Sequence, residues 1–91
     1  MEFEWGPAKA DKNLAKHGVS FIEAATVFAD PLSVVFDDPD HSGDENRFII
    51  VGTSIRRRLL VVAHTDRSDR TRIISAREAT NSERQFYEEG Y

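Results

Sequence analysis

RLLVVAHT, residues 58–65, is the most apolar of the segments with strand character. Its length and its paired valines predict a strand at the centre of a sheet. Further strands are predicted at residues 33–36, 47–52 and 71–76, because short apolar runs there are separated by polar turns. Successive strands joined by short turns form an antiparallel meander, which needs helices over one face to bury it.

Helix signals flank these strands. Residues 7–17 are predicted to form a helix that begins at a proline and stops before Gly18, because proline is tolerated at the first helical position and glycine favours the left-handed stop. Capping boxes open two more helices, SFIE at residues 20–23 and TNSE at residues 80–83. With a short edge strand at residues 3–5, the predicted order is (β)ααββββα. This is an α+β fold in which a small antiparallel sheet is packed by helices.

Composition narrows the class of protein. The chain has 91 residues, of which 40% are hydrophobic and 31% are charged, and it has no cysteine. That length predicts a single domain over residues 1–91. The lack of cysteine excludes disulfides, thiolate nucleophiles and zinc–thiolate sites, and it fits a cytoplasmic protein. No apolar run is long enough to span a membrane, and we expect no signal peptide.

The net charge of −4 hides an uneven distribution. Residues 1–46 carry ten acids and three lysines (−7), residues 47–77 carry eight arginines and two acids (+6), and residues 78–91 carry four glutamates and one arginine (−3). Net negative charge disfavours a nucleic-acid partner, but the arginine-rich segment favours one, because the guanidinium fork matches phosphate. A solvated strand surface that is simply rich in arginine is the alternative interpretation.

Basic side chains gather around the hairpin predicted between the last two strands. His64 and Arg67 follow the central strand, and Arg77 ends the next one. Strict alternation places Ile73, Ser75 and Arg77 on one side of that strand, and Arg72, Ile74 and Ala76 on the other. A compact cluster of these donors suits a phosphodiester and its pentavalent transition state. Salt bridges to Asp66, Asp69 or Glu78 are the alternative.

Two other basic groups have both a functional and a structural interpretation. Lys9, Lys12 and Lys16 form one stripe on the first helix, and residues 56–58 form a turn of three arginines. A polyanion would relieve the repulsion between adjacent arginines. A solvated helix face and a soluble turn are the alternatives.

The acidic residues and histidines give weaker signals. Glu83 is most simply the capping partner of Thr80, although Tyr87 lies one turn further on the same helix face. The loop DDPDHSGDE at residues 37–45 contains the first half of a calcium loop, but its twelfth position is Ile49, so we expect no calcium site. The three histidines lack ligand spacing, so we expect no metal site.

The chain resembles the BrnT toxins of bacterial type II toxin–antitoxin systems. The matching segments are FEW (3–5), NLAKHGVSF (13–21), EAATVFADP (23–31), DDPDHS (37–42), RFIIVG (47–52), RRLLVVAHTDR (57–67), RIISAREAT (72–80) and ER (83–84). KHGVSF and RIISAR are the most specific of these, and the resemblance covers nearly the whole chain. It implies a RelE-like fold, RNA cleavage that arrests translation and growth, and no cofactor. It also implies a BrnA-type antitoxin as partner, through which alone the pair would contact operator DNA.

RNA cleavage without a metal needs groups that transfer protons and cations that stabilise the phosphorane. The candidate catalytic residues are Arg67 and Arg77 as phosphate ligands, His64 for proton transfer, Glu83 as a weaker candidate base and Tyr87 to orient the substrate. The candidate RNA-binding residues are Lys9, Lys12, Lys16, Arg56, Arg57, Arg58, Arg70 and Arg72. A non-catalytic module that binds nucleic acid or the antitoxin, and acts as a co-repressor, is the alternative function.

Overall fold

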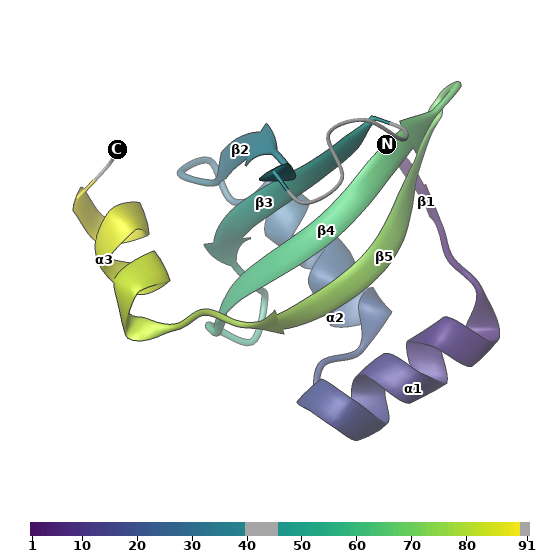
Figure 1. Cartoon of the computed structure of the whole chain (residues 1–91), viewed down its shortest axis with the longest axis horizontal. Coiled ribbons are helices and arrows are strands. Elements are labelled where there is room, and N and C mark those ends of the chain that lie inside the picture. The colour runs from purple at the N-terminus through teal and green to yellow at the C-terminus, as the bar shows by residue number, and fades with distance from the viewer. Residues whose placement is uncertain (40–45, 90–91) are drawn as a thin grey trace.

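The computed structural model describes residues 1–39 and 46–89, and in these it has a five-stranded sheet and three α-helices (Figure 1). The elements are β1 (Glu2–Glu4), α1 (Pro7–His17), α2 (Phe21–Thr26) with the 3₁₀ turn η1 (Val27–Ala29), β2 (Val34–Asp37), β3 (Arg47–Thr53), β4 (Leu59–Arg67), β5 (Arg70–Glu78) and α3 (Asn81–Glu89). The predicted α+β class and element order are confirmed. No helix in this part of the chain is long and apolar enough to cross a membrane.

The strands follow the order β1-β5-β4-β3-β2, so β4 is central as predicted. β2 to β5 form the expected antiparallel meander. β1 pairs with β5 in parallel, with Glu2 opposite Arg70 and Glu4 opposite Arg72, so one parallel pair at the edge makes the predicted antiparallel sheet a mixed one. The helices α1 and α2 carry the chain from β1 at one edge of the sheet to β2 at the other. β1 therefore pairs with the last strand of the meander and not with the strand that follows it in the chain.

The local signals at the helix ends act as predicted, with one change. Gly18 ends α1 in the left-handed conformation (φ 69°), and its N–H donates to the Leu14 carbonyl. Ser20 Oγ accepts the Glu23 N–H at 3.0 Å, which is half of the predicted capping box. The Glu23 carboxylate does not return to Ser20, because it is buried and pairs instead with Arg58, with Nε and Oε2 2.9 Å apart.

The main core lies between the two N-terminal helices and one face of the sheet. Its members are Val19, Phe21, Ala24 and Val27 from the helical layer, and Ile50, Leu60, Val62, Ile73 and Ala76 from the sheet. A smaller cluster on the opposite face consists of Val51, Leu59 and Val61, covered in part by Tyr87 from α3. Figure 1 shows α3 at one end of the strands, so it leaves the rest of this face uncovered by helices. We call this second face the open face.

A β-bulge in β5 decides which side chains reach the open face. Ala63 lies opposite Ser75, but His64 lies opposite Ile73, so Ile74 is an extra residue. Ile73 and Ala76 consequently both enter the main core. The strict alternation predicted for this strand is wrong, because the bulge resets the period-2 pattern.

Asn13 fastens α1 to β5 next to this bulge. Its Nδ2 donates to the carbonyls of Val19 and Ala76 at 3.0 and 2.8 Å, and its Oδ1 accepts the Ala76 N–H at 3.1 Å. The side chain is buried, so these bonds satisfy polar atoms that water does not reach. Asn13 is therefore a structural residue that the sequence did not single out.

Candidate active site

The open face gathers the arginines of three strands. Residues directly opposite one another in a sheet point to the same face. Val61, Thr65 and Arg67 of β4 therefore share the open face with their β5 partners Arg77, Arg72 and Arg70. Arg47 of β3 lies opposite Thr65 and joins the same face. Sequence reasoning missed Arg47 as a candidate, because nothing local shows that it would lie in line with Arg72, on the other side of Thr65.

These arginines form a track and not the compact cluster that was predicted. Arg67 and the partner of Arg77, Val61, are six residues apart on β4. At about 3.3 Å per residue, the two arginines lie about 20 Å apart along the strand direction. One phosphate cannot contact both, so the face offers two separate positions for anions.

At the hairpin end, β1 supplies carboxylates to the track. Arg72 Nη1 lies 3.3 Å from Glu4 Oε2, and Arg70 Nε lies 3.5 Å from Glu2 Oε1. Arg67 has no ion pair with the described residues. Because Arg70 and Glu2 are more than half exposed, that pair contributes little to stability. The salt-bridge interpretation thus applies to Arg70 and Arg72, although with partners other than the predicted ones.

At the other end, Arg77 is held by Glu83 from α3. The two groups form a bidentate pair with both N–O distances at 2.8 Å. Glu83 also accepts the Thr80 N–H, and Thr80 Oγ1 accepts the Glu83 N–H, so the predicted capping box is confirmed. Hydrogen bonds from Arg77, followed by those at Thr80, lower the pKa of Glu83 to about 2.

A carboxylate with so low a pKa is a weak base at neutral pH. The two hydrogen bonds that the Glu83 carboxylate accepts instead fix the direction of the Arg77 guanidinium. The Arg77 side chain is 41% exposed, so it keeps an edge that solvent or a substrate can reach.

Tyr87, one turn after Glu83, is engaged elsewhere. Its hydroxyl donates to Asp30 Oδ2 at 2.6 Å and lies 3.3 Å from Thr53 Oγ1. Asp30 Oδ2 also accepts the Thr53 N–H at 2.8 Å. Burial, followed by the hydrogen bond to Asp30, raises the pKa of Tyr87. Tyr87 therefore ties α3 to the end of the sheet.

His64 lies on the opposite face of the sheet from Arg67 and Arg77. It is 5% exposed, and its ring centroid is 4.8 Å from that of Phe28 and 5.8 Å from that of Phe48. Among the described residues, neither ring nitrogen finds a hydrogen-bond partner. Burial lowers its pKa, against the opposing charge of Asp66. The prediction that His64 joins the arginines is wrong, because alternation along β4 turns it toward the helical layer.

The other candidate RNA-binding residues lie apart from the track. Lys9, Lys12 and Lys16 are exposed on α1, which packs on the far side of the sheet. In the turn before β4, Arg56 and Arg57 are exposed. Arg58 Nε donates a hydrogen bond to Glu23 Oε2, and Arg58 Nη1 lies 3.3 Å from Glu78 Oε2. The structure therefore does not bring these groups together with Arg77.

No group of three His, Asp or Glu side chains within residues 1–39 and 46–89 is placed to hold a metal ion. Most of the acidic loop considered for calcium, including Asp40 and Ser42, lies outside the described residues. The cationic side chains placed on the open face are arginines.

An α+β domain with an arginine track on an uncovered sheet face defines a small protein suited to binding a polyanion. The model of a protein family described as the ribonuclease toxin BrnT of type II toxin–antitoxin systems matches residues 5–83. The chain therefore belongs to the BrnT family of ribonuclease toxins. Membership in a type II system implies an antitoxin partner.

A solved structure and the curated proteins add the following. The 1.1 Å crystal structure of the Brucella abortus ribonuclease toxin BrnT is similar to this chain with a TM-score of 0.70 and 23% sequence identity. The similarity covers 89% of this chain and 99% of the Brucella chain, and at this identity it shows the shared fold. Among the curated proteins, none matches the chain.

Proposed function

We propose that this chain is a metal-independent endoribonuclease that cuts RNA on the open face and thereby arrests translation and growth. The observation that supports it most is the arginine track, which gives a member of a ribonuclease toxin family a surface for the phosphates of RNA. Arginine suits this task because its fork can bind two phosphate oxygens at once.

In this proposal Arg77 contacts the phosphate that is cut. Attack of a neighbouring 2′-oxygen on phosphorus, with loss of the 2′-hydroxyl proton to water, adds negative charge to the phosphorus centre, and a fixed guanidinium stabilises that charge. The bond from phosphorus to the 5′-oxygen then breaks, and this oxygen takes a proton from water, which leaves a 2′,3′-cyclic phosphate and a 5′-hydroxyl end. Glu83 is a positioning residue, because it holds two of the guanidinium nitrogens at 2.8 Å. Tyr87 acts in the same sense by fixing α3, on which Glu83 lies.

The hairpin end of the track binds the RNA away from the cut. Arg67 is the strongest phosphate ligand there, since Arg70 and Arg72 share their charge with Glu2 and Glu4. Arg56 and Arg57 are left as exposed cations that guide RNA from a distance. His64 has no part in the proposal, because its ring nitrogens are enclosed on the other face.

We also propose that the partner is a BrnA-type antitoxin with a DNA-binding domain. The toxin would contact operator DNA only through that antitoxin, since α3, the helix at the end of the open face, carries three glutamates and one arginine and is unsuited to enter a groove of DNA. Both proteins would act in the cytoplasm.

The test is an RNA cleavage assay with purified protein, in which new 5′-hydroxyl ends are mapped. Arg77→Ala is expected to lower the cleavage rate by about 100-fold or more, the scale for loss of one transition-state donor. Arg84→Ala is the matched control, because Arg84 is exposed on α3 and pairs only weakly with Glu88 at 3.7 Å. Equal cleavage by wild type and a folded Arg77→Ala variant would show that the assignment is wrong.

EDTA tests whether cleavage is independent of metal ions. Cleavage is expected to be unchanged by EDTA, and a loss that a divalent ion restores would refute metal independence. If wild type binds RNA without producing new ends, the non-catalytic alternative is correct. That alternative has one observation in its favour, namely that Glu83 already occupies the fork of Arg77.

A further inference from the structure

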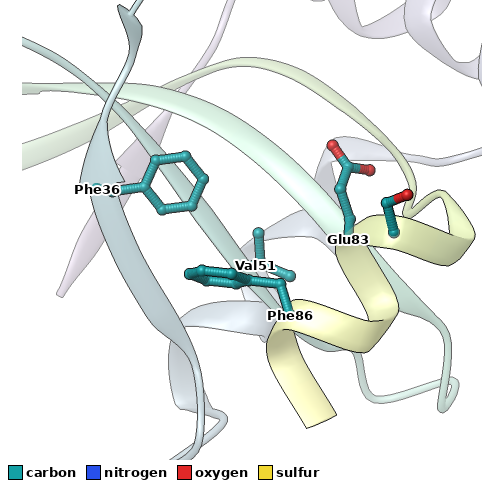
Figure 2. A pocket seen from close by; sticks show the side chains of 5 residues that line it. Phe36, Val51, Glu83 and Phe86 are labelled. Atoms are coloured by element: carbon teal, nitrogen blue, oxygen red, sulfur yellow. The ribbon is translucent and has the colours of Figure 1, made fainter. Parts of the chain in front are cut away.

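A second feature of the open face is an apolar groove between α3 and the outer strands. It has a volume of about 360 Å³ and is lined by Phe36, Val51, Ser82, Glu83 and Phe86. Figure 2 shows Phe36 of β2 and Phe86 of α3 pointing toward one another, with Glu83 at one end of the groove. The two ring centroids are 6.3 Å apart, and the rings meet edge to face at 67°.

Two aromatic side chains that line the groove are partly exposed to water. Phe36, on the edge strand β2, is 41% exposed, and Phe86, on the helix α3, is 40% exposed. α3 has no buried residue, so packing alone does not account for the position of these rings. Exposed aromatic side chains that line a concave surface are typical of binding sites.

The charge around the groove indicates what binds there. α3, which forms one wall of the groove, carries three glutamates and one arginine (−2). Even when Arg77 is added, because it pairs with Glu83, the border has a net charge of −1. A nucleic acid is repelled by such a border, whereas a basic segment of a protein is attracted.

We propose that this groove is the docking site for one segment of the antitoxin. The segment carries a large apolar side chain, which enters the groove and packs against the rings of Phe36 and Phe86, and it carries lysines or arginines on either side of that residue. Interfaces concentrate their binding energy in such aromatic pockets, and the rim charges set specificity and rate. The proposal uses the proposed function only to identify the partner as an antitoxin.

The occupant would also adjoin the candidate catalytic arginine. Glu83 lines the groove with one side of its chain and holds Arg77 with its carboxylate. A segment in the groove therefore contacts the residue that positions Arg77, so docking and the cleavage site share one side chain.

The experiment measures the affinity of the purified toxin for the purified protein encoded beside its gene, by titration calorimetry. Phe86→Ala removes one wall of the groove, and Ser82→Trp fills the groove while both phenylalanines stay. Both variants are expected to weaken binding at least tenfold, and binding by wild type is expected to weaken as salt is raised. Ile55→Ala is the matched control, because Ile55 is 78% exposed and lies outside the groove.

RNA cleavage by the same variants, without the antitoxin, separates the outcomes. Cleavage within threefold of wild type, together with weakened binding, supports the proposal. Binding that is unchanged in Ser82→Trp overturns it, whether or not Phe86→Ala folds. Unchanged binding with reduced cleavage shows that the groove holds a nucleobase instead. If wild type cuts no RNA but both variants lose the antitoxin, the proposed enzyme activity fails and the docking site stands.

Discussion

The ion pair between Arg77 and Glu83 predicts a contribution to stability that depends on pH. Glu83→Gln tests it, because glutamine keeps the size of the side chain and an oxygen for the Thr80 N–H while it removes the charge. The pKa of Glu83 falls from its ordinary value of 4.5 to about 2 in the folded protein. A carboxylate whose folded pKa is lowered stabilises the fold above about pH 4.5, and this contribution is lost as the pH falls toward 2.

The size of the effect can be worked from the same values. A change from 4.5 to about 2 corresponds to at most about 3.4 kcal/mol at neutral pH. Solvent screens the pair, because the side chains of Arg77 and Glu83 are 41% and 32% exposed. The expected loss on Glu83→Gln is therefore about 1–1.5 kcal/mol at pH 7, and well under half of that near pH 2.5.

Urea unfolding at both pH values measures this difference. Glu88→Gln is the control, because Glu88 lies on the same helix and faces Arg84 at 3.7 Å in an exposed pair. Its loss is expected to be about 0.3–0.5 kcal/mol. A Glu83→Gln variant that is as stable as wild type at pH 7 would refute the argument. So would an equal loss at both pH values, since the effect would then come from packing and not from charge.

Three further predictions concern buried residues of the fold that supports the site. Asn13→Ala is expected to cost about 2–3 kcal/mol in urea unfolding, because it leaves buried carbonyls without donors, whereas the exposed Lys12→Ala on the same helix should change little. His64→Phe is expected to make the melting temperature fall less steeply between pH 7.5 and 5.5. In wild type, His64 of the unfolded chain binds a proton below its ordinary pKa of 6.5, whereas burial lowers the pKa of His64 in the folded protein, so the fold loses stability as the pH falls. An unchanged slope would contradict this. Gly52→Ala is expected to cost about 1–3 kcal/mol, because the new Cβ would lie 2.9 Å from Val27 Cγ1, and a melting curve that matches wild type would disprove the clash.

Much of the fold is predictable from the sequence, because its signals are local. The two capping boxes act over three residues, and the glycine that ends α1 acts on its own turn. The alternative interpretation of Glu83 as a capping residue is local in the same way. The parallel pairing of β1 is not a local signal, because it places Glu2 opposite Arg70, which is far away in the sequence. No residue close to Glu2 in the sequence indicates which strand β1 pairs with.

The site is less predictable for the same reason. Phe36 and Phe86 form the groove although 50 positions separate them, and each alone resembles an ordinary apolar residue of its element. The position of His64 in the chain predicts that it joins the arginines, but the face of a strand decides which neighbours a side chain meets. Its aromatic surroundings come from Phe28 and Phe48, which belong to two other elements.

The bulge at Ile74 explains how one strand serves both faces of the sheet. Ile73 and Ala76 are three positions apart, so a regular strand cannot place both in the core. If Ile73 stayed in the core of a regular β5, Arg77 would point toward the helices, where an unpaired charge is costly. The extra residue turns Arg77 out to the face that carries Arg72. Asn13 holds both backbone groups of Ala76 from the far side of the sheet, so the helical layer fixes the position from which Arg77 emerges.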